Sequence, residues 1–187
     1  SISSLIPKDF TGQIVIKQQN KFVFRKNFGP KERIFKTPIN DSTVFNIGQV
    51  SQTMIAYFFE NLFANGQIQP NNKVKKYITT FPYENIQIQH LLKHQSGLPH
   101  LYIKLYHRKV YNNWNLKLSD RGIRFDNEDI LNILTKEKPA LKFTPGDSTA
   151  YSDVNYLILT SLLEEATHIS FPEYATSIFE QKFIFKP

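Results

Sequence analysis

Histidine and cysteine are the side chains best suited to bind a transition metal, and their pattern in this sequence favours no metal site. The chain contains no cysteine, which excludes disulfide frameworks, thiolate zinc sites and cysteine nucleophiles. His90, His100 and His107 are ten and seven residues apart, and these intervals match no zinc-ligand spacing. We therefore expect neither a bound metal nor another cofactor.

A basic aromatic stretch, residues 101–125, is the second group of residues with a chemical use. It contains six cations and a single anion, Asp120, so its charge is +5 out of the net charge of +7 for the whole chain. Tyrosine and tryptophan residues are interleaved with the cations, a composition that can bind an anionic polymer such as teichoic acid, a glycan or nucleic acid. We favour a simpler interpretation, a solvated insertion anchored by its aromatic side chains, with no specific nucleic-acid partner. The residues concerned are Lys104, Arg108, Lys109, Lys117, Arg121 and Arg124, with Tyr102, Tyr106, Tyr111 and Trp114.

The overall composition is that of a folded globular protein. The 187 residues suffice for about one domain, or for two small ones. Hydrophobic residues make up 41% and aromatic residues 14%, which argues for a real core and against disorder. No segment approaches the ~18 consecutive apolar residues of a membrane span. The sequence opens on Ser1, so we expect any signal peptide or tag to have been removed.

Periodicity predicts one β-hairpin followed by a mostly helical body. Apolar and polar residues alternate over 12–18 and 21–27, with Gln19 and Asn20 between them. The 3.6-residue period predicts helices over 50–65, 127–136, 153–166 and 171–181, with a short helical passage over 86–93. Ser170 and Glu173 have capping-box spacing, which predicts the start of the last helix. The first helix has a broad aromatic stripe and is expected to be central; the stripe is Val50, Met54, Ile55, Phe58, Phe59, Leu62 and Phe63.

Four segments resemble the serine β-lactamase and penicillin-binding-protein superfamily, in order and in approximate spacing. FNIGQVSQTMIA at 45–56 resembles the family's F-x-I-G-S-x-x-K, and HLLKHQSGLP at 90–99 resembles its H-L-L-x-H-x-S-G-L-P. FTPGDSTAYSDVNYLILTSLLEEAT at 143–167 resembles its F-x-P-G…Y-S-N segment, and residues 10–29 resemble its opening hairpin. The SGLP segment is shared with class C-like esterases and D-aminopeptidase or carboxypeptidase types.

The resemblance implies a site in which a helix-opening serine is the nucleophile and a lysine three residues later takes its proton. Residues i and i+3 are neighbours on a helix, so the amine reaches the hydroxyl. In this sequence Gln49 and Gln52 occupy those two positions, and an amide is neither a nucleophile nor a base near neutral pH. No serine is followed by lysine at i+3; Thr135 and Lys138 have that spacing, but at the end of a predicted surface helix.

The second and third elements of the family site are altered as well. Tyr151 occupies the position of the tyrosine that assists the nucleophile, but Asp153 replaces the asparagine that positions substrate. The K-T-G or H-x-G strand does not occur in the chain. We identify Gln49, Gln52, Tyr151 and Asp153 as a degenerate substrate-binding site without catalytic residues. A simpler alternative stays open, in which the two amides face water and Tyr151 is a packed aromatic with a hydrogen-bonded hydroxyl.

The expected fold is α+β, β-lactamase/transpeptidase-like, with the closing strands absent from this chain. Residues 1–48 would form the N-terminal hairpin and loop of an α/β sandwich, and residues 49–187 its inserted helical part. A lone hairpin is marginal in water, so we expect a complementing segment or a second copy to complete the sheet. The apolar residues Phe179, Phe183, Ile184 and Phe185 would otherwise be left exposed.

The expected function is that of a catalytically inactive module with a binding or regulatory role. The alternative is an active serine hydrolase (β-lactamase, esterase or D,D-peptidase) that uses an unrecognised nucleophile or is completed by another segment. A cell-wall glycan, a peptide or a polyanion is the expected ligand. The resemblance also implies an extracytoplasmic or cell-envelope location in a bacterium.

Overall fold

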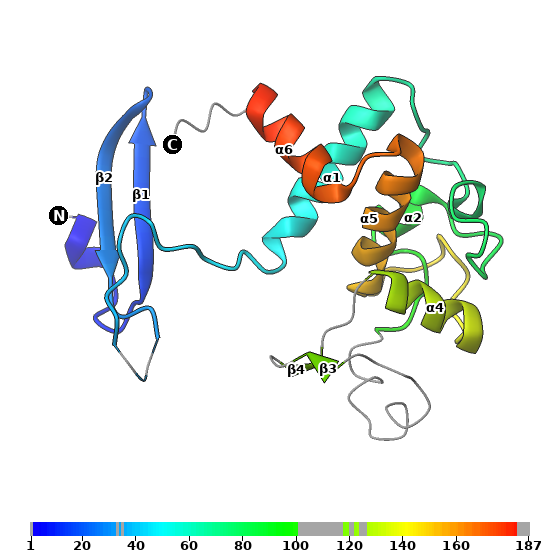
Figure 1. The fold of residues 1–187 in the computed structure, drawn as a ribbon, viewed down its shortest axis with the longest axis horizontal. Helices are drawn as coiled ribbons and strands as arrows, with labels where there is room; N and C mark the ends of the chain where they lie inside the picture. The colour runs from blue at the N-terminus through cyan, green and yellow to red at the C-terminus, as the bar shows by residue number, and fades with distance from the viewer. Residues whose placement is uncertain are drawn as a thin grey trace. The chain divides into compact units, whose positions relative to one another are not determined.

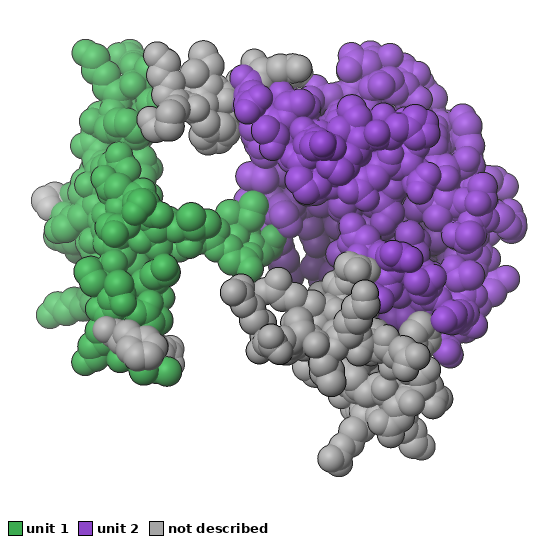
Figure 2. Space-filling model, viewed as in Figure 1, with its two compact units in different colours: residues 1–48 green, residues 49–187 purple. Residues whose placement is uncertain are grey.

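The computed structural model describes residues 2–32, 34, 36–100, 118–119, 122–123 and 127–182. The chain forms two compact units, residues 1–48 and residues 49–187, which Figure 2 distinguishes by colour. The basic aromatic stretch, residues 101–125, lies outside the described residues apart from two short strands, β3 (Leu118–Ser119) and β4 (Gly122–Ile123). The interpretations of that stretch therefore stay predictions.

The first unit is the predicted β-hairpin, preceded by a short 3-10 helix, η1 (Ile2–Leu5). Strands β1 (Gly12–Gln18) and β2 (Lys21–Phe28) pair antiparallel, from Gly12 opposite Phe28 to Gln18 opposite Lys21 (Figure 1). Gln19 and Asn20 both have positive φ, 46° and 64°, which is the backbone of the tight hairpin turns that match the twist of the strands. A bulge between Ile16 and Lys17 shifts the register near the turn.

The hairpin stands without a third strand in the described part of the chain. Val15, Ile16, Phe22 and Val23 are all exposed. Two strands alone are marginal in water. The need for a complementing segment is therefore still a prediction.

The second unit is built from five α-helices within the described residues, and α5 is the one at its centre. The helices are α1 (Val50–Ala64), α2 (Ile88–Leu92), α4 (Asn127–Glu137), α5 (Val154–Thr167) and α6 (Phe171–Lys182), with a 3-10 turn η2 (Val74–Lys76). Helix α5 packs against α1, α2, α4 and α6 (Figure 1). The sequence predicted α1 to be central; that prediction is wrong, because α5 is apolar on more than one side and four helices use those sides.

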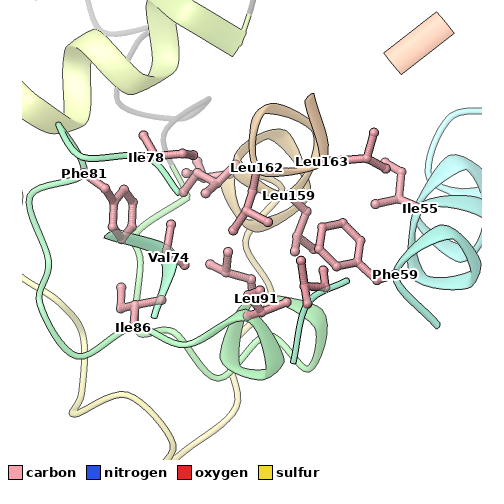
Figure 3. Close-up of a cluster of buried hydrophobic side chains, with 14 of the residues drawn as sticks. Ile55, Phe59, Val74, Ile78, Phe81, Ile86, Leu91, Leu159, Leu162 and Leu163 are labelled. Atoms are coloured by element: carbon pink, nitrogen blue, oxygen red, sulfur yellow. The ribbon is translucent and has the colours of Figure 1, made fainter. Parts of the chain in front are cut away.

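The core of this unit lies between α5, α1 and the segments around η2 and α2. Figure 3 shows Leu159, Leu162 and Leu163 of α5 among residues of the other segments. Those are Ile55, Phe59, Val74, Ile78, Phe81, Ile86 and Leu91. The predicted stripe of α1 is correct except at Val50, which is 59% exposed.

The last helix begins where its sequence signal places it. The Ser170 amide donates to Glu173 Oε2 at 3.3 Å and the Glu173 amide donates to Ser170 Oγ at 3.5 Å, as the capping-box spacing requires. Phe179, which we expect to be exposed unless another segment covers it, is covered within this unit: its ring lies 5.8 Å from that of Phe58 and packs on the core. The other terminal apolar residues, 183–185, lie outside the described residues.

Candidate functional site

The turn that follows α2 fixes the backbone on which the site is built. His94 and Gly97 both have positive φ, 54° and 75°. A Cβ on Gly97 would lie 2.4 Å from the backbone oxygen of Phe143, so only glycine fits. The Lys142 amide donates to the Gly97 carbonyl at 2.7 Å, and the Ala150 amide donates to the His94 carbonyl at 2.9 Å. These bonds hold the loop before α5 against the turn after α2.

A buried hydrogen-bond network joins that turn to the start of α5. The Ser96 hydroxyl donates to Asn155 Oδ1 at 2.6 Å, and Asn155 Nδ2 donates to His94 Nδ1 at 3.0 Å. The Ser152 amide also faces His94 Nδ1, at 3.4 Å, and its hydroxyl donates to the Pro99 carbonyl at 3.1 Å. Ser96, Ser152 and Asn155 are buried. Because each polar group has a partner, the network positions both segments without leaving a buried polar group unsatisfied.

The network makes His94 neutral. Two N–H donors face Nδ1, which must therefore carry its lone pair, so the ring proton sits on Nε2. Burial lowers the pKa of His94 below its ordinary value of 6.5. The ring also lies 4.8 Å from that of Tyr151 and 5.3 Å from that of Tyr156. His94 thus serves as a hydrogen-bond acceptor and a packing surface beside the site.

We expect the helical unit to lose stability as the pH falls through the histidine range. Burial lowers the folded-state pKa of both His90 and His94. Below about pH 6.5 the unfolded chain therefore binds protons that the folded chain does not, and the free energy of unfolding decreases. Urea unfolding at about pH 7.5 and about pH 5.5 measures the difference.

The control for this experiment is His94→Asn, because asparagine tolerates positive φ at this position and does not titrate. The pH dependence should be smaller in that variant than in the unchanged chain. An unchanged slope in His94→Asn would show that His94 does not contribute.

Gln52 and Tyr151 come together although they are far apart in sequence. Gln52 Nε2 donates to the Tyr151 hydroxyl at 3.1 Å. Tyr151 is 42% exposed, and its ring lies 4.8 Å from that of His94 and 5.9 Å from that of His100. The hydroxyl thus has an amide for a partner, in an open position that a ligand can reach.

Asp153 faces a different partner. Its Oδ1 lies 2.5 Å from His100 Nδ1 and also accepts from the Val154 amide at 3.0 Å, which caps α5. A carboxylate at a helix N-terminus is stabilising because it meets the free backbone N–H groups. Asp153 therefore caps α5 and positions His100.

Gln49 lies at the N-cap of α1, with its side chain exposed and making no capping hydrogen bond. Its carbonyl accepts from the Gln52 amide at 3.0 Å. Of the four predicted site residues, the structure thus joins Gln52 to Tyr151, places Gln49 one turn before Gln52, and pairs Asp153 with His100. Thr135, the residue followed by a lysine at i+3, is not part of this group. Its hydroxyl makes hydrogen bonds with the carbonyls of Leu131 and Thr80.

Sequence reasoning missed the supporting residues Ser96, Asn155 and His100. Ser96 and Asn155 are 59 residues apart and His100 and Asp153 are 53 apart, so no local spacing relates them. The available signal was the polar Asn155 on the apolar face of a predicted helix, since a buried amide needs a partner.

The described residues contain no group of three or more histidine, cysteine, aspartate or glutamate side chains that could hold a metal. Among those same residues, no helix has the length and apolar character needed to cross a membrane.

The chain is similar to a known protein family and to several known proteins. The model of the Beta-lactamase family matches residues 11–181. Penicillin-binding protein 4* of Bacillus subtilis (strain 168) is 28% identical over 171 residues, covering 91% of this chain and 36% of that protein. Teichoic acid D-alanine hydrolase of Staphylococcus aureus (strain MRSA252) is 27% identical over 173 residues, covering 90% and 38%. The chain thus spans little more than a third of these curated relatives.

Solved structures show the same arrangement. A penicillin binding protein from Bacillus halodurans superposes with a TM-score of 0.73 at 21% identity, covering 93% of this chain and 50% of that one. FmtA from Staphylococcus aureus superposes with a TM-score of 0.68 at 24% identity, covering 97% and 45%. At these identities the likeness establishes the fold, and it confirms the expected partial α+β architecture.

Proposed function

Because the chain belongs to the Beta-lactamase family, we propose that its degenerate site binds a ligand without forming an acyl-enzyme. One observation carries the proposal: Gln49 and Gln52 stand at the positions of the family's serine and lysine, and the Gln52 amide is hydrogen-bonded to Tyr151. An amide cannot attack a carbonyl as a hydroxyl does, and it takes up no proton near neutral pH.

What these groups can do is hydrogen-bond a polar ligand. An amide has two donors and an acceptor, and a phenol has one donor as well as its acceptor oxygen. Gln52 and Tyr151 present both kinds of group at an exposed position. The proposed ligand is a cell-wall glycan, a peptide or a polyanion, and the proposed role is binding or regulation.

Reaction with a fluorescent penicillin or a fluorophosphonate tests this proposal. The unchanged chain should stay unlabelled at every serine, as judged by gel fluorescence and intact mass. Gln49→Ser should stay unlabelled too, because the base is still missing. Gln49→Ser/Gln52→Lys restores both groups on one helix face, and this variant should label slowly once the remaining strands of the fold are supplied.

Covalent labelling of the unchanged chain would overturn the proposal. It would favour the alternative, an active β-lactamase, esterase or D,D-peptidase with another nucleophile or with a residue supplied by another segment. The names of relatives such as teichoic acid D-alanine hydrolase give that alternative its chemistry.

We extend the proposal to partners and location. A complementing segment or a second copy of the chain completes the hairpin sheet, which fits the exposed hairpin residues and the greater length of the relatives. Residues 1–48 form part of the α/β sandwich, and residues 49–187 form its helical subdomain. An extracytoplasmic or cell-envelope location is supported by the relatives from Bacillus subtilis and Staphylococcus aureus and by what their names say.

A further inference from the structure

The hairpin carries an uncompensated positive charge that the proposed site does not use. Residues 12–28 contain Lys17, Lys21, Arg25 and Lys26 and no aspartate or glutamate. All four cations are exposed. Arg25 forms an ion pair with Asp41 of the following loop at 3.2 Å, so the net charge of the surface rests mainly on the three lysines.

Apolar side chains gather at the same end as two of those lysines. The turn sets Lys17 opposite Phe22 and Gln18 opposite Lys21, so the cations flank the tip. Phe22 is 61% exposed and Val23 is 52% exposed. The Phe22 ring lies 5.3 Å from Lys17 Nζ and 5.8 Å from Arg25 Cζ, which gathers the charge around the ring.

The strand register separates this tip from the surface that a core would cover. Lys17, Phe22 and Arg25 share one face of the hairpin, as the contacts of the Phe22 ring show. Phe24 pairs with Ile16, which shares the opposite face with Ile14 because side chains alternate along β1. The bulge interrupts that alternation on β2 between Phe22 and Phe24, so these two residues belong to different faces. A complementing segment on the Ile14 and Phe24 face therefore leaves the tip available.

We propose that the hairpin tip docks on the surface of an anionic lipid bilayer. Phe22 and Val23 enter the interface, while Lys17 and Lys21 lie at the level of the lipid phosphates (Figure 1 shows the tip between β1 and β2). Exposed aromatic and apolar residues flanked by lysine have the composition of interfacial anchors. A soluble polyanion accounts for the lysines but gives no reason for a neighbouring pair of exposed apolar side chains.

Vesicle co-sedimentation of the 187-residue chain tests the proposal, with phosphatidylcholine vesicles that contain about 30 mol % phosphatidylglycerol. Lys17→Glu/Lys21→Glu should weaken binding by about 30-fold or more, because each lysine near an anionic surface contributes about fivefold. Phe22→Ser should weaken binding several-fold, and Phe22→Leu, which stays apolar, should retain it. Vesicles of phosphatidylcholine alone should bind weakly.

Matched controls separate the tip from the total charge. Lys73→Glu/Lys76→Glu makes the same change of net charge on exposed lysines of the helical unit and should have little effect. Soluble polyphosphate, used as a second probe, should bind Phe22→Ser as it binds the unchanged chain.

Three outcomes would overturn the proposal. The first is an absence of binding to the anionic vesicles, and the second is an equal loss in the tip variant and in the Lys73 and Lys76 control. The third is full vesicle binding by Phe22→Ser or by the tip charge variant, with the loss appearing instead in Arg108→Glu/Lys109→Glu. None of these results bears on acylation of the degenerate site.

Discussion

Gly97→Ala is expected to lower the free energy of unfolding of the helical unit by about 3 to 4 kcal/mol. Gly97 has a φ of 75°, and a Cβ there would lie 2.4 Å from the backbone oxygen of Phe143 and 3.3 Å from its nitrogen. Neither backbone atom can rotate away, so the two segments must separate and the bond from the Lys142 amide to the Gly97 carbonyl is lost. Urea unfolding followed by far-UV circular dichroism measures the loss.

Gly66→Ala is the matched control. Gly66 has a φ of 70°, but nothing lies within 4 Å of the position that a Cβ would take there, so the substitution carries only the cost of a left-handed alanine, about 1 to 2 kcal/mol. The difference between the two variants isolates the close approach of Gly97 to Phe143. Equal losses would show that the backbone conformation alone explains the glycine.

Asn155→Leu is the second substitution with a large expected effect, a loss of about 3 to 5 kcal/mol in the free energy of unfolding. Asn155 is fully buried and bridges the Ser96 hydroxyl to His94 Nδ1. Leucine has a similar volume but accepts and donates nothing, so the buried Ser96 hydroxyl loses its acceptor. Chemical denaturation of the two chains side by side gives the difference.

A double-mutant cycle with Ser96→Ala checks the mechanism of that loss. The combined variant should be less destabilised than the sum of the single variants, because the second change removes the group that the first leaves unsatisfied. Asn132→Leu, at an exposed position of α4, should change stability by about 0.5 kcal/mol or less. Additive losses would contradict a bridging role for Asn155.

Local pattern determined the elements of this protein. The alternation over 12–27 and the turn at Gln19 and Asn20 predicted the hairpin, and the 3.6-residue period predicted α1, α4, α5 and α6. The Ser170 and Glu173 spacing predicted the start of α6, which the structure confirms. Such features follow from the backbone geometry of a few neighbouring residues, so a sequence is enough to reveal them.

The order and spacing of the family segments also predicted the residues of the proposed site, Gln49, Gln52, Tyr151 and Asp153. The contacts of those residues could not be predicted in this way. Gln52 contacts Tyr151, which is 99 residues away in the sequence, and Asp153 contacts His100, which is 53 residues away. Only the packing of α1 and α2 on α5 brings those pairs together, because a side chain's partner depends on which elements share a core.

The tertiary structure likewise decided which helix is central and which histidine is neutral. The aromatic stripe of α1 suggested a central helix, but α5 holds that position because four helices pack around it. His94 shows no signal in the sequence for its tautomer; the donors that fix it come from Ser152 and Asn155 at the start of α5. Periodicity reports which face of an element is apolar, whereas burial and hydrogen-bond partners arise only when separate elements meet.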